Sequence, residues 1–213
     1  MLRLYIININ LLYMLLQFIK RTNIKLLCID FDKTLVSVQT HGKWNKTAEE
    51  LAIYVRPEFK KLIKYAFQNG IYVSIVTFSP QIDLVKKCLE INFPNLYKNI
   101  IIRGTNQKYN INSDLLKSLG ITNEARKNKM IASVILEIQK KYNINIKLNN
   151  IILIDDDYSN ICAARSHFGT FFYNKRYMYN IQENFNNNEI KYKNDLLIIF
   201  TILSISLVIY SKL

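Results

Sequence analysis

Two apolar runs that each end in aspartates constrain the fold of this chain most. Five of the eight aspartates follow them directly: residues 24–29 lead to Asp30 and Asp32, and residues 151–154 lead to Asp155, Asp156 and Asp157. A short, continuously apolar run bounded by polar residues is typical of a parallel strand covered on both faces. Open α/β sheets bind ligands beyond the carboxyl ends of such strands. The pattern predicts two neighbouring strands whose acids converge on one metal-dependent carboxylate site.

Helical and strand patterns alternate through the rest of this region. In chain order they are a helix over 57–67, a strand over 71–77, a helix over 80–89, a strand over 99–102, a helix over 128–142 and a strand over 170–173. Ser79 is expected to cap the helix that starts at Pro80. Alternation of this kind predicts an α/β fold, a Rossmann-like three-layer α/β/α sandwich with a mostly parallel sheet.

Composition divides the chain into four segments. We expect an N-terminal apolar helix packed on the domain (1–21), a catalytic domain (22–176), an Asn-rich linker (177–195) and an apolar tail (196–213). Residues 196–210 carry no charge but would span only roughly 22 Å of a hydrocarbon core of roughly 30 Å. With its flanking residues the tail is expected to be a C-terminal membrane anchor, with the domain on the cytosolic side. A disordered tail or an erroneous gene model is the alternative there, and a membrane signal anchor is the alternative for residues 1–21.

Charge and cysteine spacing exclude several classes of function. The net charge of +13 comes mostly from scattered lysines, so no nucleic-acid partner is expected. The three cysteines lie far apart and form no C-x-x-C pair, which indicates a reducing, cytoplasmic location rather than a zinc site or a disulfide framework. His41 and His167 lack a nucleophile context, so a hydrolase triad has little support.

Four short motifs follow one another in this region. Residues 30–35 read Asp-Phe-Asp-Lys-Thr-Leu, which is similar to motif I of the haloacid dehalogenase (HAD) superfamily, usually D-x-D-x-T after an apolar strand. The other three resemblances are Thr77 to the motif II Ser/Thr, Lys127 or Lys129 to the motif III lysine, and Asp155-Asp156-x-x-x-Asn160 to motif IV. The resemblance covers roughly residues 22–176 and implies a HAD-like fold.

The resemblance implies a magnesium-dependent phosphatase. Asp30 would attack phosphorus and Asp32 would act as general acid and base. Thr77 and one of the two lysines, of which we prefer Lys127, would bind the phosphoryl group. The expected magnesium ligands are Asp30, the backbone carbonyl of Asp32, Asp155 and Asp156. Asn160 is expected behind these ligands, and Asp157 is expected to cap the following helix.

The intervals between the motifs leave no room for a large cap domain. Capless members of the superfamily resemble phosphatases of proteins or other bulky substrates, so we expect an open site and a phosphorylated partner of that kind. Residues 36–44 and 103–119 would form its rim. The alternative from another class is a HAD-fold, membrane-tethered binding or scaffold module with weak or no catalysis.

Overall fold

The computed structural model describes residues 15–124, 126–173 and 181–182. The chain divides into two units, Met1–Glu183 and Asn184–Leu213, and the second lies outside the described residues. The expected membrane anchor at residues 196–213 therefore lies outside them too. In the part that is described, no helix is long and apolar enough to cross a membrane.

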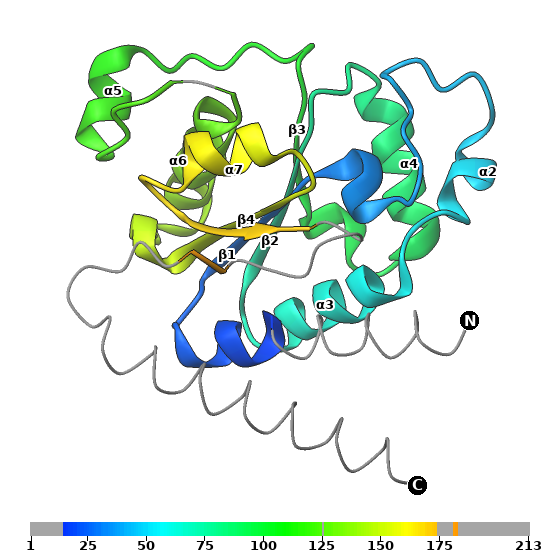
Figure 1. Cartoon of the computed structure of the whole chain (residues 1–213), viewed down its shortest axis with the longest axis horizontal. Helices are drawn as coiled ribbons and strands as arrows, with labels where there is room; N and C mark the ends of the chain where they lie inside the picture. Colours follow the sequence, from blue (N-terminus) through cyan, green and yellow to red (C-terminus); the bar gives the residue numbers. More distant parts are fainter. Residues whose placement is uncertain (1–14, 125, 174–180, 183–213) are drawn as a thin grey trace, which may run out of the picture. The chain divides into compact units, whose positions relative to one another are not determined.

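A mostly parallel sheet forms the centre of the first unit (Figure 1). Its strands, in spatial order, are β3 (Ile101–Arg103), β2 (Tyr72–Val76), β1 (Leu26–Ile29), β4 (Ile151–Asp155), β5 (Gly169–Phe172) and β6 (Ile181–Gln182). The first five are parallel, and β6 runs antiparallel to β5. The strand order reverses direction between β1 and β4, where open α/β sheets bind ligands.

The two acid-bearing strands are neighbours, which brings their acids together. Leu26 pairs with Ile151 and Ile29 with Ile154, and every residue of both strands is buried. Burial on both faces explains why the two runs are continuously apolar rather than alternating. The Asp30 N–H donates to the Ile154 carbonyl at 2.9 Å, so Asp30 leaves the sheet beside the end of β4.

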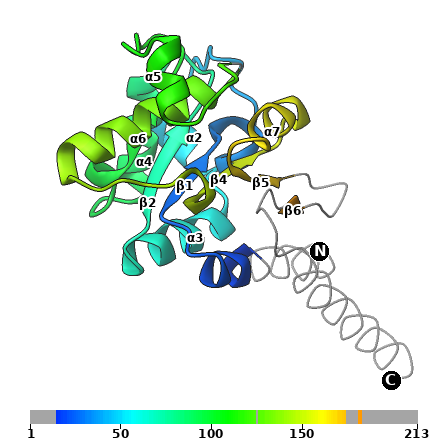
Figure 2. The same cartoon turned by 90° about the vertical axis from the view of Figure 1, so that its left-hand side faces the viewer.

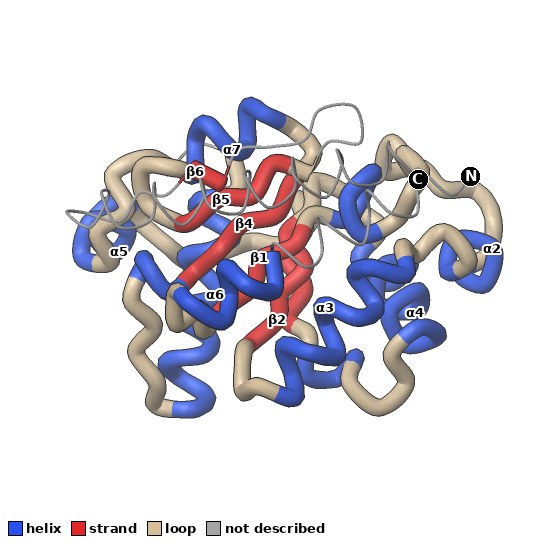
Figure 3. The backbone as a smooth tube through the Cα atoms, turned by 60° about the horizontal axis from the view of Figure 1, so that its bottom comes forward, coloured by secondary structure: helices blue, strands red, loops and turns tan. Residues whose placement is uncertain are grey.

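Helices cover both faces of the sheet, and Figure 3 shows the strands as a red central layer between them. The helices are α2 (Ala48–Ala52), α3 (Pro57–Gln68), α4 (Ile82–Asn92), α5 (Ser113–Ser118), α6 (Asn128–Tyr142) and α7 (Tyr158–Ala164), with short turns η1 (Phe31–Leu35), η2 (Tyr97–Asn99) and η3 (Leu148–Asn150). Apolar residues of α6 join Leu26 and Cys28 of β1 in one buried core. α3 lies on the other side of the sheet (Figure 2). The α/β fold class predicted from the sequence is confirmed.

Residues 15–21 form the described part of the expected N-terminal helix. Its Leu15, Phe18 and Ile19 are buried. Within the described residues, the interval from β1 to β2 holds η1, α2 and α3, and the interval from β2 to β4 holds α4, β3, α5 and α6. Neither interval contains a separate domain, so the described chain has no large cap.

The structure differs from the sequence prediction in several places. α4 begins at Ile82 rather than at Pro80, because Gln81 has non-helical dihedrals (φ −87°, ψ 60°). Ser79 does not cap that helix; its Oγ accepts from the Gln81 N–H at 3.2 Å, which closes a local turn. α2 and α5 were not expected, although Thr47 and Glu50 form a capping box on α2 that is readable in the sequence. β6 lies inside the segment expected to be a linker.

Candidate active site

A pocket of about 440 Å³ opens at the carboxyl ends of the central strands. It is lined by Asp30, Asp32, Lys33, Gln39, Thr77, Phe78, Lys127, Asp155, Asp156, Asp157, Tyr158, Asn160 and Phe172. The structure therefore brings together all the candidate catalytic, phosphate-binding and metal-binding residues predicted from the sequence except Lys129. Lys129 is half-buried and is not among the residues lining the pocket.

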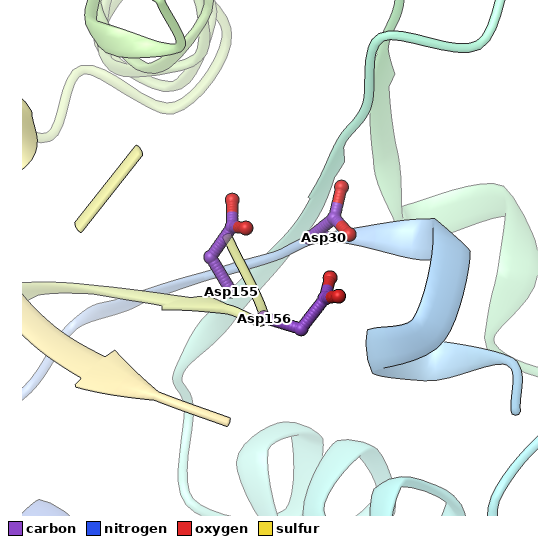
Figure 4. A group of neighbouring side chains, drawn as sticks. All are labelled: Asp30, Asp155 and Asp156. Atoms are coloured by element: carbon purple, nitrogen blue, oxygen red, sulfur yellow. The ribbon is translucent and has the colours of Figure 1, made fainter. Parts of the chain in front are cut away.

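Three carboxylates meet on one side of this pocket. Asp30 follows β1 and Asp155 and Asp156 lie at the end of β4, and one oxygen from each lies within 4.8 Å of the others (Figure 4). Asp155 is fully buried and Asp30 nearly so, whereas Asp156 is half-buried. A donor set made only of oxygens is what magnesium prefers, and these residues fit such an ion. The Asp32 carboxylate is not part of this cluster; its expected ligand atom is the backbone carbonyl.

Lys127 is the buried cation of the site. It directly precedes α6, and its Nζ forms ion pairs with Asp30 Oδ1 and, at 2.8 Å, with Asp155 Oδ2. Burial alone would lower the pKa of Lys127, but the two carboxylates outweigh it and hold that pKa above its ordinary value. Lys127 therefore stays charged and delivers one positive charge to the floor of the pocket.

Asp30 is a carboxyl group whose ionisation is costly. Burial raises its pKa to about 7; the Lys127 ammonium opposes this rise, while the neighbouring Asp155 adds to it. One lysine thus offsets only part of the cost of burying two carboxylates side by side. A bound divalent cation would lower the pKa of Asp30 further and favour its ionised, nucleophilic form.

Hydrogen-bond donors orient the β4 acids. Asn160 Nδ2 donates to both oxygens of Asp155, at 3.2 and 3.0 Å, and the Asp157 N–H donates to Asp155 Oδ1 at 2.8 Å. The Thr34 hydroxyl donates to Asp156 Oδ1 and accepts from the Asp156 N–H, both at 3.1 Å. These contacts fix the two carboxylates before any ligand binds.

Asp157 caps α7, as predicted from the sequence. Its side chain accepts from the Ser159 N–H at 2.7 Å, and it also lies 3.5 Å from Arg126 Nη1 in an ion pair. Arg126 Nη1 in turn lies 3.4 Å from Asn160 Oδ1. Asp157 is thus engaged in holding the loop and helix behind the site.

The wide turn η1 carries Asp32 away from β1. Lys33 in this turn has φ 56°, in the left-handed region, and Asp32 is extended. The buried Arg56 holds the turn, because its guanidinium donates to the carbonyls of Thr34 and Lys33, each at 3.0 Å. Sequence reasoning missed Arg56, since its partners lie more than twenty residues away and no local spacing marks it.

Thr77 follows β2 on the other side of Asp30. Its Oγ accepts from the Ser79 N–H at 3.1 Å, which leaves the hydroxyl hydrogen available to an acceptor in the pocket. The sequence reading also placed the start of the next helix at this spot. α4 begins later, and neither Pro80 nor Ile82 lines the pocket.

Comparisons with known proteins found distant likenesses only. No protein-family model and no curated protein matches the chain. Among solved structures, DsGPDH of Dunaliella salina matches with 17% identity and a TM-score of 0.38, over 68% of this chain and 22% of that one. The chain thus spans about a fifth of the length of DsGPDH. The HAD domain of the effector protein Lem4 from Legionella pneumophila matches in two structures, with 13% and 14% identity and TM-scores of 0.35.

The two Lem4 matches cover 82% of this chain and 93% and 94% of the matched chains, and the first of them is described as an inactive mutant. Because the identities and TM-scores are low, a function is inferred from the geometry of the pocket alone.

Proposed function

We propose that the protein is a HAD-type, magnesium-dependent phosphatase that hydrolyses a phosphate monoester through a phosphorylated Asp30. The observation that supports this most is the position of Asp30. Its carboxylate lies in an open pocket, in an ion pair with the buried Lys127, within 4.8 Å of two further acids and among residues that include Thr77 and Asp32. Phosphoryl transfer to water needs this combination of nucleophile, positive charge and proton donor.

In the first step an Asp30 oxygen attacks phosphorus while the bond from phosphorus to the leaving oxygen breaks. The leaving oxygen takes the proton of the Asp32 carboxyl group, so the alcohol departs neutral. In the second step a water molecule attacks phosphorus, its proton passes to the Asp32 carboxylate, and the bond from phosphorus to Asp30 breaks. Inorganic phosphate leaves and both aspartates return to their starting states.

The remaining residues stabilise charge on the phosphoryl group. Lys127 and Thr77 would donate to its non-bridging oxygens, which carry the charge in the transition state. Magnesium, held by Asp30, Asp155 and Asp156, would supply the further positive charge that lets an anionic substrate approach three acids. Asn160 and Thr34 keep Asp155 and Asp156 in the orientation that this requires.

We propose a bulky phosphorylated substrate, such as a phosphoprotein. The described residues contain no cap over the pocket, so the phosphoryl group of a large molecule can reach Asp30. Exposed aromatic side chains, Phe78 and Tyr158, lie on the walls of the pocket beside the charged floor.

The test is hydrolysis of aryl phosphates and of phosphopeptides by the purified full-length chain. We expect turnover that requires magnesium, is abolished by EDTA and returns when magnesium is added in excess. Rapid acid quenching with a radiolabelled substrate should trap label on the protein, and mass spectrometry should locate it on Asp30. Absence of turnover over a broad phosphate panel, with the protein folded and magnesium bound, would favour a binding module instead.

A further inference from the structure

Thr40, in the rim segment 36–44, contacts the Asp32 carboxylate, which transfers the proton in the proposed function. Its hydroxyl donates to Asp32 Oδ2 at 2.9 Å, and Gln39 Nε2 lies 3.4 Å from the same oxygen. Asp32 Oδ1 is buried and has no hydrogen-bond partner among the described residues. The two oxygens of one carboxyl group thus have different surroundings.

The direction of the Thr40 hydroxyl follows from its other contact. The Gly42 N–H donates to Thr40 Oγ at 3.2 Å, so this oxygen acts as acceptor there and its hydrogen is free to point at Asp32. Thr40 is only 6% exposed, so water does not compete for either contact. The geometry therefore defines Oδ2 of Asp32 as a hydrogen-bond acceptor.

The backbone around Thr40 is held in place from the opposite side of the rim. Gln81 makes reciprocal hydrogen bonds with the Trp44 backbone, at 2.7 Å from the Trp44 N–H and at 3.1 Å to the Trp44 carbonyl. Gly42 has φ +65°, and a Cβ at this position would come within 2.7 Å of the Pro80 ring. The segment that carries Thr40 is thus fastened to the turn that follows Thr77.

We infer that Thr40 is a positioning residue that holds the Asp32 carboxyl group in one orientation for proton transfer, an inference that rests on the proposed phosphatase function. The hydrogen bond from the Thr40 hydroxyl to Oδ2 prevents rotation of the carboxyl group. In that orientation the carboxyl group gives its proton to the leaving oxygen and later takes one from water.

The experiment measures kcat/KM of the full chain for phosphate esters whose leaving groups differ in basicity. Thr40→Val keeps the shape of the side chain but removes the donor. We expect it to lower kcat/KM by about 10- to 100-fold for an alkyl or phenyl phosphate, whose leaving oxygen needs the proton. For p-nitrophenyl phosphate, whose leaving group departs as an anion, the loss should be within about threefold. The ratio kcat/KM is the right measure because it reports the first chemical step.

Two controls separate positioning from a general effect on the fold. Thr40→Ser retains the hydroxyl and should restore most of the activity on the phenyl ester. Ser37→Ala changes an exposed hydroxyl in the same segment and should have no effect. Asp32→Asn should show the same leaving-group dependence as Thr40→Val, and the double variant should be no worse than Asp32→Asn alone.

An equal loss on all esters, or a loss that Thr40→Ser does not rescue, would overturn the inference. The contact itself is tested without catalysis by urea unfolding of Thr40→Val, Asp32→Ala and the double variant. Thr40→Val should lower the folding equilibrium constant at least fivefold more when Asp32 is present than when it is alanine, and equal losses would overturn it. Absence of turnover by the wild-type chain would instead refute the proposed function, so the two failures are distinguishable.

Discussion

The two acid clusters that meet in the pocket are held in different ways. On the β4 side, Asp155 accepts hydrogen bonds from Asn160 and from the Asp157 backbone and pairs with Lys127. On the β1 side, the described contacts of the Asp30 carboxylate are with Lys127, and Asp32 keeps one buried oxygen without a partner among the described residues.

This difference matches two kinds of task. Carboxylates with fixed donors are suited to hold a cation, because a metal site works only if its ligands are already oriented. A carboxylate that must form or transfer a bond needs an oxygen that the protein has not already engaged. We therefore propose that the β4 cluster orients the cation, which Asp30 would also contact, and that the β1 cluster carries the chemistry.

The largest expected effect comes from removing the proposed nucleophile. Asp30→Asn should lower kcat by at least about 10⁴-fold on any phosphate ester, because an amide does not attack phosphorus. Circular dichroism should show an unchanged fold, since the substitution keeps the size of the side chain. Asp114→Asn, an exposed acid in α5, is the matched control and should retain full activity. Turnover by Asp30→Asn within about tenfold of wild type would place the nucleophile elsewhere.

The next largest effect concerns Lys127, which forms ion pairs with both clusters. In metal-free buffer, Lys127→Met should cost about 3–5 kcal/mol in the free energy of unfolding, because two buried carboxylates would remain without their counter-ion. Saturating magnesium should recover part of that loss by supplying another positive charge. Urea unfolding with and without EDTA measures both.

Lys129→Met is the comparison, since Lys129 does not line the pocket; it should change the free energy of unfolding by no more than about 0.5 kcal/mol. Equal costs for the two lysines would remove Lys127 from the centre of the site.

Much of the fold was predictable because the signals were local. The apolar runs that became β1 and β4 lie in the fully buried centre of the sheet, where no polar face interrupts them. α6 begins and ends at the predicted residues. The start of α4 was not predictable, because Gln81 is kept out of the helix while its side chain binds the distant Trp44 backbone. No local pattern contains that contact.

The residues of the candidate site were likewise predictable only where the signal was local. The motif spacing indicated Asp30, Thr77 and Asp155 because each directly follows a strand, and the ends of parallel strands converge on one edge of the sheet. Spacing left Lys127 and Lys129 as alternatives, since both precede or begin the same helix. Only the structure shows that Lys127 reaches the carboxylates. Arg56 and Thr40 were missed because their contacts are with backbone or side chains of the η1 turn, whose shape no motif predicts.

A pH titration of the metal-free protein tests whether the Asp30 carboxyl group in the β1 cluster binds a proton in the folded chain. The pKa of Asp30 is about 7 in the folded chain and about 4 when unfolded, so between these values the folded state binds the extra proton. This contribution to stability is greatest at low pH and is lost as pH rises to about 7, with a slope of at most about 1.4 kcal/mol per pH unit.

The difference in unfolding free energy between wild type and Asp30→Asn isolates this slope from other groups, including His167, whose pKa burial lowers. With EDTA, the stability of wild type relative to Asp30→Asn should fall as pH rises. This fall should be smaller when magnesium is present, because the metal displaces the proton. A difference that does not vary with pH would mean that Asp30 is already ionised without metal.

The smallest effect should come from loosening the β4 cluster without removing a charge. Asn160→Ala deletes the donor that contacts both oxygens of Asp155, and it should weaken magnesium binding by about 10- to 100-fold in calorimetry. Turnover should recover at high magnesium, since the chemical residues are intact. Ser159→Ala, which changes the neighbouring exposed side chain, should bind magnesium like wild type. If Asn160→Ala lowered turnover at saturating magnesium and left the affinity unchanged, the β4 cluster would take part in the chemistry, and the division between the clusters would fail.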